Sequence, residues 1–350
     1  MKIYAHGADI HQYNRELIDF SSNINPLGPS PAIIDEIKAF SIRYHDVTRY
    51  PDAFYIKLRE HLAENMGCSK EQVIVGNGAT ELIHLFVRAM GFRKWLIPVP
   101  AFLEYERAVL LNNGIPVYYY LKEDHDFKLR PGDLIDGLED VDAVILANPN
   151  NPTGTLMDAR LLIEFIKYAG KKGKYIMLDE AFIEFVRCYE NISMVRYVNT
   201  CENLFVIRAA TKFYGIPGLR LGYGFACKSI IERLNEYKEL WTVNALAQQV
   251  GMKLYTESDY IHQTQIYVEK ERNFLMKGLT RIDYIQPLPS SANFILCRLK
   301  KGNAFALKEK LIDKGILIRD ASNFTGLDER YFRIAVKKHE ENIMLINALS

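Results

Sequence analysis

The sequence has few cysteines and no long apolar run, and both shortages narrow its class. None of its five cysteines stands in a C-x-x-C pair, so neither a zinc site nor a disulfide framework is indicated. No apolar stretch approaches the roughly 20 residues of a membrane helix, and the N-terminus shows no apolar signal core. A net charge of +1 gives no broad attraction to nucleic acid or to membranes. We therefore expect a cytoplasmic protein with free thiols and no metal, in which individual arginines bind anions.

The 350 residues exceed what one hydrophobic core usually organises, which indicates two domains. The middle of the chain alternates short apolar runs with helical stretches, a pattern typical of a mostly parallel sheet covered by helices on both faces. After about residue 229 a smaller α+β domain is expected, beginning with a long helical stretch over 245–279. The expected strands are 72–75, 95–99, 117–121, 143–147, 175–178, 204–207 and 221–226, then 293–299, 316–319 and 331–336.

Lys212 follows the expected strand at 204–207, at the edge of the sheet where open α/β folds bind ligands. A lysine at a strand end is usually only a solvated charge. Here a glycine-rich segment follows it and includes Arg220, and arginine can grip a phosphate with two parallel hydrogen bonds. A free lysine has a pKa near ~10.4 and is a poor nucleophile, but its amine can hold an aldehyde cofactor as an imine. The pair therefore indicates a pyridoxal phosphate enzyme.

Two further strand ends carry side chains suited to the same cofactor. Asp179 alone reads as a helix cap or a metal ligand, but beside Lys212 its charge would keep a pyridine nitrogen protonated. The protonated ring is an electron sink, and the small Ala181 leaves room for a flat ring. Asn151 lies in a turn rich in Asn, Pro and Gly. Its amide is placed to donate to the phenolate oxygen of the ring.

Gly78, Ala79 and Thr80 connect an expected strand to an expected helix. The third glycine of a dinucleotide fingerprint is missing, yet backbone N–H groups at a helix N-terminus favour a phosphate. Phe102 follows the strand at 95–99. It is either a core residue or a ring that stacks on the cofactor, a contact worth about 0.5–1.5 kcal/mol.

Taken in their order along the chain, the five motifs around Gly78, Phe102, Asn151, Asp179 and Lys212 resemble the fold-type I pyridoxal phosphate enzymes of the aspartate aminotransferase superfamily. The resemblance implies an N-terminal arm (1–29) that packs with the small domain, a large domain (30–240) with a mostly parallel seven-stranded sheet, and a small α+β domain (241–350). Four more segments are similar to the L-threonine-O-3-phosphate decarboxylases, which make aminopropanol phosphate for the cobalamin side chain. They are Asp19–Gly28, Arg49–Asp52, Trp241–Leu246 and Gly326–Arg333.

The resemblance also implies a role for each site residue. Lys212 would hold the cofactor covalently, Asp179 would pair with the pyridine nitrogen, Asn151 would contact the ring oxygen, and Phe102 and Ala181 would contact the ring. Tyr55 would reach the cofactor phosphate of the other subunit in a homodimer. The other cofactor contacts implied are Gly78, Ala79, Thr80, Thr211 and Arg220.

On the substrate side, the resemblance places Arg333 at the carboxylate, with Asn25 and Asn151 nearby. It places Arg319 at the substrate phosphate, helped by His6 and Gly7 on the arm.

Two positions depart from the pattern of the family. Ala209 stands where similar enzymes often have a serine, which leaves Thr211 as the nearby hydroxyl. Asp9 stands on the arm, where the decarboxylases tend to have asparagine, and we expect its charge to point away from a phosphate site.

The reaction itself depends on which bond at the substrate Cα is held perpendicular to the ring, and Arg319 and Arg333 would set that. Phe182 stands where histidinol-phosphate aminotransferases typically have tyrosine, so decarboxylation of threonine phosphate is the first expectation and histidinol-phosphate transamination the second. Serine phosphate differs by one methyl, worth only about 1–3 kcal/mol of discrimination, and stays open as a substrate. A catalytically silent sensor with the same fold is the remaining alternative.

Overall fold

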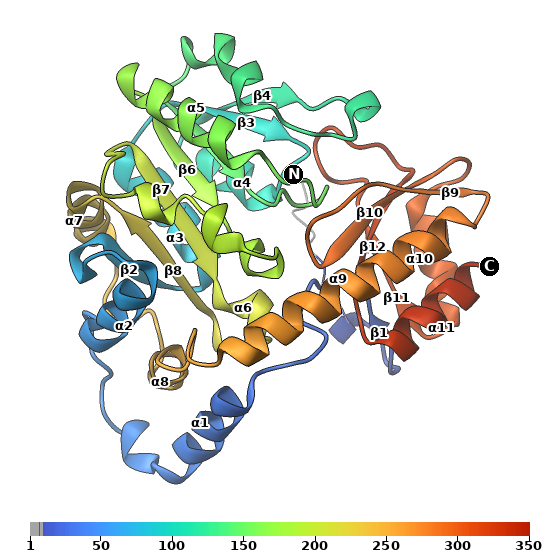
Figure 1. The fold of residues 1–350 in the computed structure, drawn as a ribbon, viewed down its shortest axis with the longest axis horizontal. Coiled ribbons are helices and arrows are strands. Elements are labelled where there is room, and N and C mark those ends of the chain that lie inside the picture. Colours follow the sequence, from blue (N-terminus) through green and yellow to red (C-terminus); the bar gives the residue numbers. More distant parts are fainter. Residues whose placement is uncertain (1–6, 8–9) are drawn as a thin grey trace.

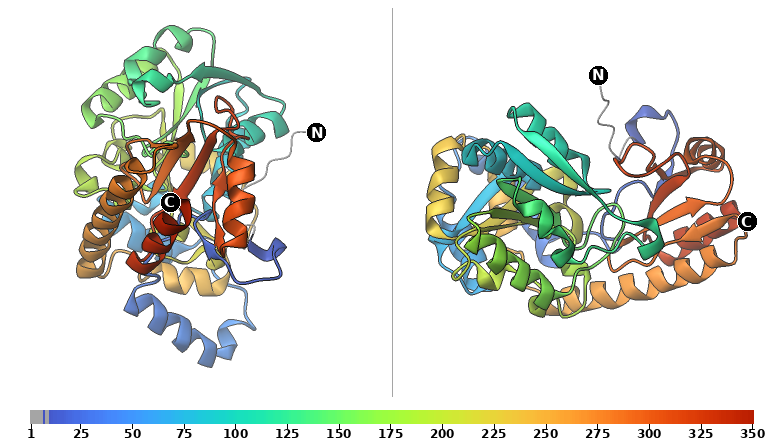
Figure 2. Two further views of the ribbon diagram at one scale, coloured as in Figure 1. Left: turned by 90° about the vertical axis from the view of Figure 1, so that its right-hand side faces the viewer. Right: turned by 90° about the horizontal axis from the view of Figure 1, so that it is seen from above.

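A computed structural model of the chain describes residue 7 and residues 10–350. His6 and Asp9, both named from the sequence, lie outside the described residues. The chain forms a large layered domain and a smaller domain, and the long helix α9 (Ser258–Thr280) runs from one to the other (Figure 1). Seen from above, the two domains lie side by side with α9 along one edge (Figure 2).

The large domain contains a seven-stranded sheet in the order β2-β8-β7-β6-β5-β3-β4. Strand β8 is antiparallel to both of its neighbours, and the other pairings are parallel. The predicted mostly parallel seven-stranded sheet is therefore confirmed. Its strands are β2 (Val73–Asn77), β3 (Lys94–Val99), β4 (Ile115–Tyr120), β5 (Ala143–Ala147), β6 (Tyr175–Asp179), β7 (Leu204–Ala209) and β8 (Leu221–Ala226).

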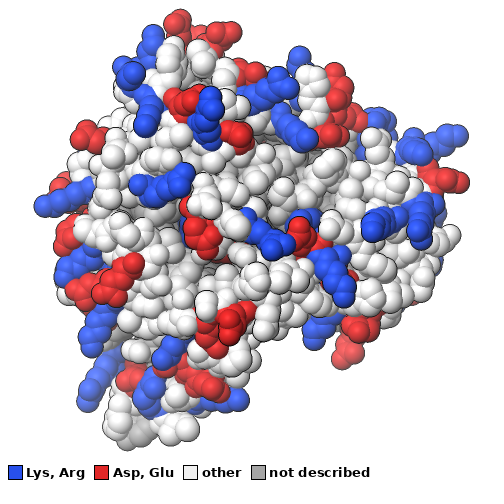
Figure 3. Space-filling model, in the orientation of Figure 1, with Lys and Arg blue, Asp and Glu red and all other residues white. Residues whose placement is uncertain are grey.

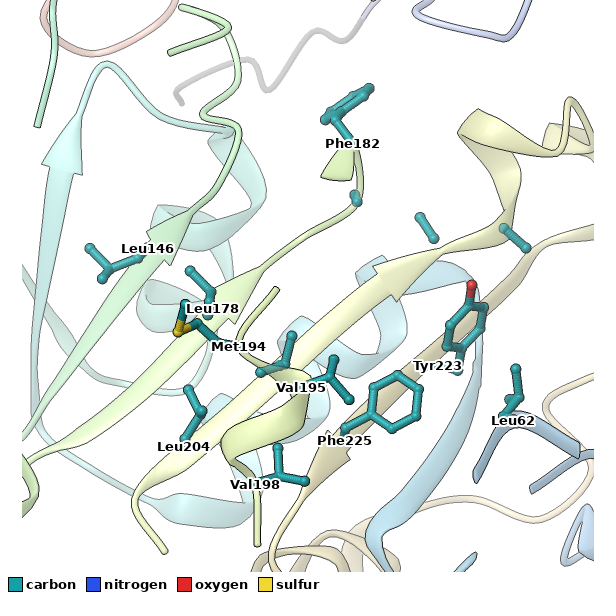
Figure 4. Close-up of a cluster of buried hydrophobic side chains, with 14 of the residues drawn as sticks. Leu62, Leu146, Leu178, Phe182, Met194, Val195, Val198, Leu204, Tyr223 and Phe225 are labelled. Atoms are coloured by element: carbon teal, nitrogen blue, oxygen red, sulfur yellow. The ribbon is translucent and has the colours of Figure 1, made fainter. Parts of the chain in front are cut away.

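Helices cover both faces of this sheet because its central strands are apolar on both sides. In β7, Leu204 and Val206 pack into one core cluster, whereas Phe205 and Ile207 pack into the other. Figure 4 shows Leu146, Leu178 and Leu204, from three neighbouring strands, in the first of these clusters. The helices in this part of the chain are α1 (Pro31–Ile42), α2 (Ile56–Met66), α3 (Gly78–Met90), α4 (Leu103–Leu111), α5 (Ala159–Lys171), α6 (Ala210–Phe213), α7 (Lys228–Tyr237) and α8 (Ala245–Gly251), of which α1 lies away from the sheet (Figure 1).

The small domain packs a four-stranded antiparallel sheet against helices around a third core cluster. The sheet has the order β12-β13-β10-β9. Strand β1 of the N-terminal segment pairs in parallel with β11, so this segment lies against the small domain. The elements are β1 (Ile18–Asp19), β9 (Ile285–Pro287), β10 (Phe294–Leu299), α10 (Ala304–Asp313), β11 (Ile316–Leu317), β12 (Arg319–Asp320), β13 (Tyr331–Ala335) and α11 (His339–Leu349).

A fourth apolar cluster joins the two domains beside the ends of the sheet strands. Leu103 and Phe127 of the large domain meet Phe324 and Tyr331 of the small domain there. The rings of Phe127 and Tyr331 pack edge to face at 5.8 Å. An ion pair between Glu123 and Arg298 crosses the same boundary. This cluster therefore fixes how the two domains face each other.

The expected single helical stretch over 245–279 is wrong in one respect, because the structure divides it into α8 and α9. Between them Tyr255 adopts a left-handed conformation with φ of 66°. Its hydroxyl donates to Glu184 Oε1 at 3.1 Å, inside a buried polar cluster. A tertiary contact thus interrupts a segment whose local sequence favours helix.

Charges on the face shown in Figure 3 are mixed in sign and spread over both domains. Among residues 7 and 10–350, no helix combines the length and the hydropathy needed to cross a bilayer.

Candidate active site

A cavity of about 500 Å³ lies between the carboxyl ends of the sheet strands and the small domain. The structure brings most of the sequence-predicted residues together here. Asn25 and Tyr55 do not line the cavity, and Gly78 lies beneath Arg220 at its edge. The predicted residues that line it are Gly7, Ala79, Thr80, Phe102, Asn151, Asp179, Ala181, Thr211, Lys212, Arg220, Arg319 and Arg333.

Lys212 reaches the cavity from α6, the short helix that directly follows β7. Burial is the main cause that lowers its pKa, from 10.5 to about 8, and the positive charges of Arg333 and Arg220 add to the effect. Near physiological pH the neutral amine, which is the form that attacks an aldehyde, is therefore far more populated than in an ordinary lysine.

Asn25 holds the lysine segment from behind and does not face the cavity. Its backbone N–H donates to the carbonyl oxygen of Lys212 at 3.1 Å, and its side-chain amide donates to the carbonyl oxygen of Phe213 at 2.7 Å. The expected substrate contact of Asn25 thus has no geometric support. Its neighbour Asn23 lines the cavity instead, and Asn23 Oδ1 is buried without a hydrogen-bond partner among the described residues.

The N-terminus of α3 and the guanidinium of Arg220 form an anion cradle at one end of the cavity. Gly78 has a φ of +78°, and a Cβ placed there would lie 2.4 Å from Arg220 Nη2. Only glycine therefore lets the guanidinium fold over the first turn of α3. A Cβ at Gly222 would likewise lie 2.4 Å from the backbone nitrogen of Ala79. Free N–H groups and an arginine suit a phosphate at this place.

Asp179 lies at the end of β6, with its carboxylate held on both sides. Tyr105 donates a hydrogen bond to Oδ2 at 2.7 Å, and the Ala181 N–H donates to Oδ1 at 2.8 Å. Burial raises the pKa of Asp179, whereas these two hydrogen bonds and Lys212 oppose the rise. The arrangement gives a buried carboxylate able to accept one further hydrogen bond from a cationic ring.

The opposite end of the cavity carries two buried arginines from the small domain. Arg333 donates to Asn151 Oδ1 and to the carbonyl oxygen of Ser21, while Arg319 donates to Asn323 Oδ1 at 2.7 Å. Burial, and then the charge of Arg319, lowers the pKa of Arg333. Two nearby cations in a low-dielectric site favour a ligand with two anionic groups.

Tyr55 lies in the core of its own chain. Its side chain is 4% exposed, its hydroxyl accepts a hydrogen bond from Val243 N–H, and the Lys238 ammonium lies over its ring. By contrast, Tyr50 in the neighbouring loop is 83% exposed. Ala209, the departure noted above, lines the cavity beside Thr211, without a hydroxyl of its own.

Sequence reasoning missed several cavity residues. Tyr105 stands three residues after Phe102, the residue that precedes α4, and this spacing of about one helical turn is a signal that could have placed both on the same side. Glu104 and Arg107 also line the cavity and form an ion pair, in which His84 contacts the same carboxylate. A helix start rich in acidic residues gave no signal that separated these from surface charges.

The donor set matches pyridoxal phosphate group by group. It offers a partly neutral lysine, a carboxylate for the ring nitrogen, an amide for the ring oxygen and a glycine-opened cradle for the phosphate. Among the described residues, no cluster of three His, Cys, Asp or Glu side chains is arranged to hold a metal ion.

Comparisons with known proteins agree with this donor set. A model of the aminotransferase class I and II family matches residues 15–349. A protein of Caldanaerobacter subterraneus subsp. tengcongensis, provisionally named a threonine-phosphate decarboxylase, is 50% identical over 349 residues, which are 100% of this chain and 94% of the relative.

Two solved structures are also similar. The L-threonine-O-3-phosphate decarboxylase of Porphyromonas gingivalis has 28% identity and a TM-score of 0.84, with 94% of this chain and 97% of the other covered. The histidinol-phosphate aminotransferase of Clostridium acetobutylicum has 35% identity and a TM-score of 0.88, with 95% and 98% covered. Given the matched residues 15–349, this chain belongs to the class I and II aminotransferase family, and its cofactor is pyridoxal phosphate.

Proposed function

We propose that this protein decarboxylates L-threonine O-3-phosphate to (R)-1-aminopropan-2-yl phosphate, which serves the cobalamin nucleotide loop. The observation that carries the proposal is the pair of buried arginines, Arg319 and Arg333, at the far end of a cavity that also holds Lys212. A phosphorylated amino acid has two anionic groups that match this pair. The relative with 50% identity supports the same reaction.

The residues of this chain have distinct tasks in that reaction. Pyridoxal phosphate, when bound, supplies a cationic ring that accepts the electron pair of the broken bond. Asp179 would hold the ring nitrogen protonated, the side-chain amide N–H of Asn151 would donate to the ring oxygen, and Arg220 with the α3 N-terminus would bind the cofactor phosphate. Arg333 fixes the substrate carboxylate, whose carbon leaves as carbon dioxide. Lys212 Nζ then delivers one proton to the substrate Cα.

Orientation of the substrate is the main contribution of the two arginines. Arg333 is fixed between Asn151 and the Ser21 carbonyl, so it can hold the carboxylate in one direction. Arg319 is fixed by Asn323 and lies 5.4 Å from the centre of the Phe324 ring. Holding a substrate close to its reactive geometry can lower the activation free energy by up to about 7–11 kcal/mol in the best cases.

Phe182 supports decarboxylation over transamination. It lies at the cavity wall, 6% exposed, with its ring 5.0 Å from that of Phe294, and Figure 4 shows it beyond the end of β6. Unlike a tyrosine, it donates no hydrogen bond to the ring oxygen, so Asn151 remains the side-chain donor there.

The direct test is incubation of the holoenzyme with threonine phosphate, serine phosphate and histidinol phosphate in turn. Carbon dioxide release from threonine phosphate without 2-oxoglutarate is expected, and release from serine phosphate measures how much the methyl group matters. Conversion of histidinol phosphate that requires 2-oxoglutarate and forms glutamate, with no carbon dioxide released from threonine phosphate, would reject the proposal. Lys212→Ala is the matched inactive control.

Histidinol-phosphate aminotransferase is the second candidate, because the solved aminotransferase with 35% identity has the same fold with a TM-score of 0.88. That activity requires a cavity wall that binds the imidazole ring of histidinol phosphate, and it requires 2-oxoglutarate as a second substrate. The three-substrate assay distinguishes the two activities directly.

We also propose that the protein acts as a homodimer. Large apolar side chains gather on the loop after α1 and near residue 241: Ile42 (81% exposed), Val47 (70%), Tyr50 (83%) and Trp241 (45%). The rings of Tyr50 and Trp241 lie 4.9 Å apart. Because Tyr55 is enclosed in its own chain, we assign the reach into the partner's cavity to Tyr50 in its place.

Sedimentation velocity tests the dimer, and mixed dimers test the reach. Lys212→Ala and Tyr50→Ala proteins are each expected to be poorly active, and a mixture refolded together should regain activity, since a hybrid dimer has one site with both residues intact. No recovery, with dimers present, would reject the assignment of Tyr50. The same mixing experiment, with Tyr55→Phe in place of Tyr50→Ala, is the control.

A cytoplasmic location is proposed from the thiols. All five cysteines are free, as is usual in a reducing compartment.

A further inference from the structure

We propose that Tyr105 is a positioning residue that sets where the proton lies between Asp179 and the pyridine nitrogen of the cofactor. The inference rests on the cofactor roles proposed for Asp179 and Phe102. Tyr105 stands on the first turn of α4 and is 1% exposed, with its ring at the cavity wall. Its side chain contacts both residues, Asp179 by a hydrogen bond and Phe102 by a ring contact.

The contacts of Tyr105 define the plane of the carboxylate. Its hydroxyl donates to Asp179 Oδ2 at 2.7 Å, and the Ala181 N–H donates to Oδ1 at 2.8 Å. With one donor on each oxygen, the carboxylate cannot rotate without losing a hydrogen bond. The remaining lone pairs are free for a donor in the cavity. The ring of Tyr105 also packs edge to face against Phe102 at 5.6 Å and 85°, which limits the tilt of the stacking ring.

The hydroxyl of Tyr105 acts only as a donor to Asp179. Burial, and then the charge of Asp179, raises the pKa of Tyr105 well above its ordinary value, so the phenol stays protonated. A hydrogen bond donated to a carboxylate stabilises its ionised form and makes it a weaker base. A proton shared between Asp179 and the pyridine nitrogen therefore stays on the nitrogen. Without Tyr105, the proton moves toward the carboxylate and the ring becomes a poorer electron sink.

Other charges near Asp179 do not replace this donor. Glu180 raises and Lys212 lowers the pKa of Asp179 through charge alone. Glu180 is engaged on its other side, where its carboxylate accepts hydrogen bonds from Ser193 at 2.6 Å and from Arg208 at 3.2 Å. Tyr105 is thus the side-chain hydrogen bond that opposes the effect of burial on Asp179.

The chain provides a matched control for the loss of a buried hydroxyl. Tyr214 is 2% exposed, and its hydroxyl has no hydrogen-bond partner among the described residues. It lies two residues after Lys212 and packs edge to face on Phe213 at 5.3 Å. Tyr214→Phe therefore removes the same atom, close to the same site, without touching Asp179.

The test uses holoenzyme reconstituted with cofactor that carries ¹⁵N at the ring nitrogen. In Tyr105→Phe, the ¹⁵N resonance is expected to move toward the value of an unprotonated pyridine, and the dissociation constant of the cofactor to rise by about tenfold to a hundredfold, the range for a hydrogen bond to a charged group. Tyr214→Phe should leave both quantities unchanged. An unchanged resonance in Tyr105→Phe would overturn the inference.

Asp179→Asn separates this failure from failure of the role of Asp179. If the resonance moves in Asp179→Asn but not in Tyr105→Phe, only the role of Tyr105 is rejected. If it moves in neither variant, the pairing of Asp179 with the ring nitrogen is rejected as well, and the inference falls with it.

Discussion

Covalent attachment of the cofactor to Lys212 should have a pH dependence set by the protein. Burial and two neighbouring arginines lower the pKa of Lys212 from 10.5 to about 8. At pH 7 the neutral amine then amounts to about 9% of the protein, against about 0.03% for an ordinary lysine, a gain of roughly 300-fold in reactive species. The rate of attachment to the apo-protein should rise with pH, reach half of its maximum near pH 8 and level off above about pH 9.

Stopped-flow absorbance after mixing apo-protein with pyridoxal phosphate measures this rate between pH 6.5 and 9.5. The same measurement on Nα-acetyl-lysine, whose amine has an ordinary pKa, corrects for ionisation of the cofactor itself. A rate that follows the model amine and continues to rise through pH 9.5 would refute the reasoning.

The lowered pKa also makes a prediction about stability. Between pH 8 and 10.5 the unfolded apo-protein binds a proton at Lys212 that the folded protein does not, so stability rises with pH across this window. Below pH 8 the full penalty remains, at most about 3 kcal/mol for a side chain at a cavity wall. Urea unfolding should therefore show Lys212→Met to be more stable than the unaltered apo-protein at pH 7, with the difference shrinking toward pH 10.5.

Three further outcomes are expected. Gly78→Ala should weaken cofactor binding, measured by cofactor titration, because the added Cβ would meet Arg220 and the φ of this residue is positive. Gly91 has a similar φ but lies in open space, so Gly91→Ala should lower only the stability, by about 1–2 kcal/mol in thermal denaturation. Arg208→Met leaves the buried carboxylates of Glu180 and Glu184 without their cation and should cost about 3–5 kcal/mol in urea unfolding. Arg333→Lys loses the two parallel hydrogen bonds proposed to hold the substrate carboxylate. It should reduce transition-state stabilisation, obtained from the ratio of kcat/KM values in steady-state decarboxylation, by about 1.5–3 kcal/mol, with cofactor affinity unchanged.

The sheet and the cofactor residues could be predicted because their signals are local. The buried central strands are apolar on both faces, so they appear in the sequence as short apolar runs. The chemistry-bearing residues then stand at strand ends, as do Asp179, the last residue of β6, and Lys212, which follows β7. Register brings these ends together, since Ala147 of β5 pairs with Asp179.

The rest depends on contacts between distant residues. Asn25 and Asn23 are two positions apart in the same segment, and only the packing against α6 decides that Asn25 binds backbone while Asn23 faces the cavity. Tyr255 breaks a helix to reach Glu184, 71 residues away. Tyr105 meets Asp179 across a separation of 74 residues. No spacing rule along one chain predicts pairings of this kind.

The cluster that joins the domains has a consequence for how reaction type changes within such a family. Lys212 and Asp179 belong to the large domain and Arg333 to the small one. In the proposed reaction, the angle between the domains would therefore decide which substituent of Cα lies perpendicular to the ring and near the lysine. Leu103, Phe127, Phe324 and Tyr331 pack together between the domains, yet Phe127 and Tyr331 do not line the cavity. Substitutions of apolar residues that never touch the substrate could therefore change which reaction is catalysed. A search for the residues that determine the reaction should include this cluster between the domains.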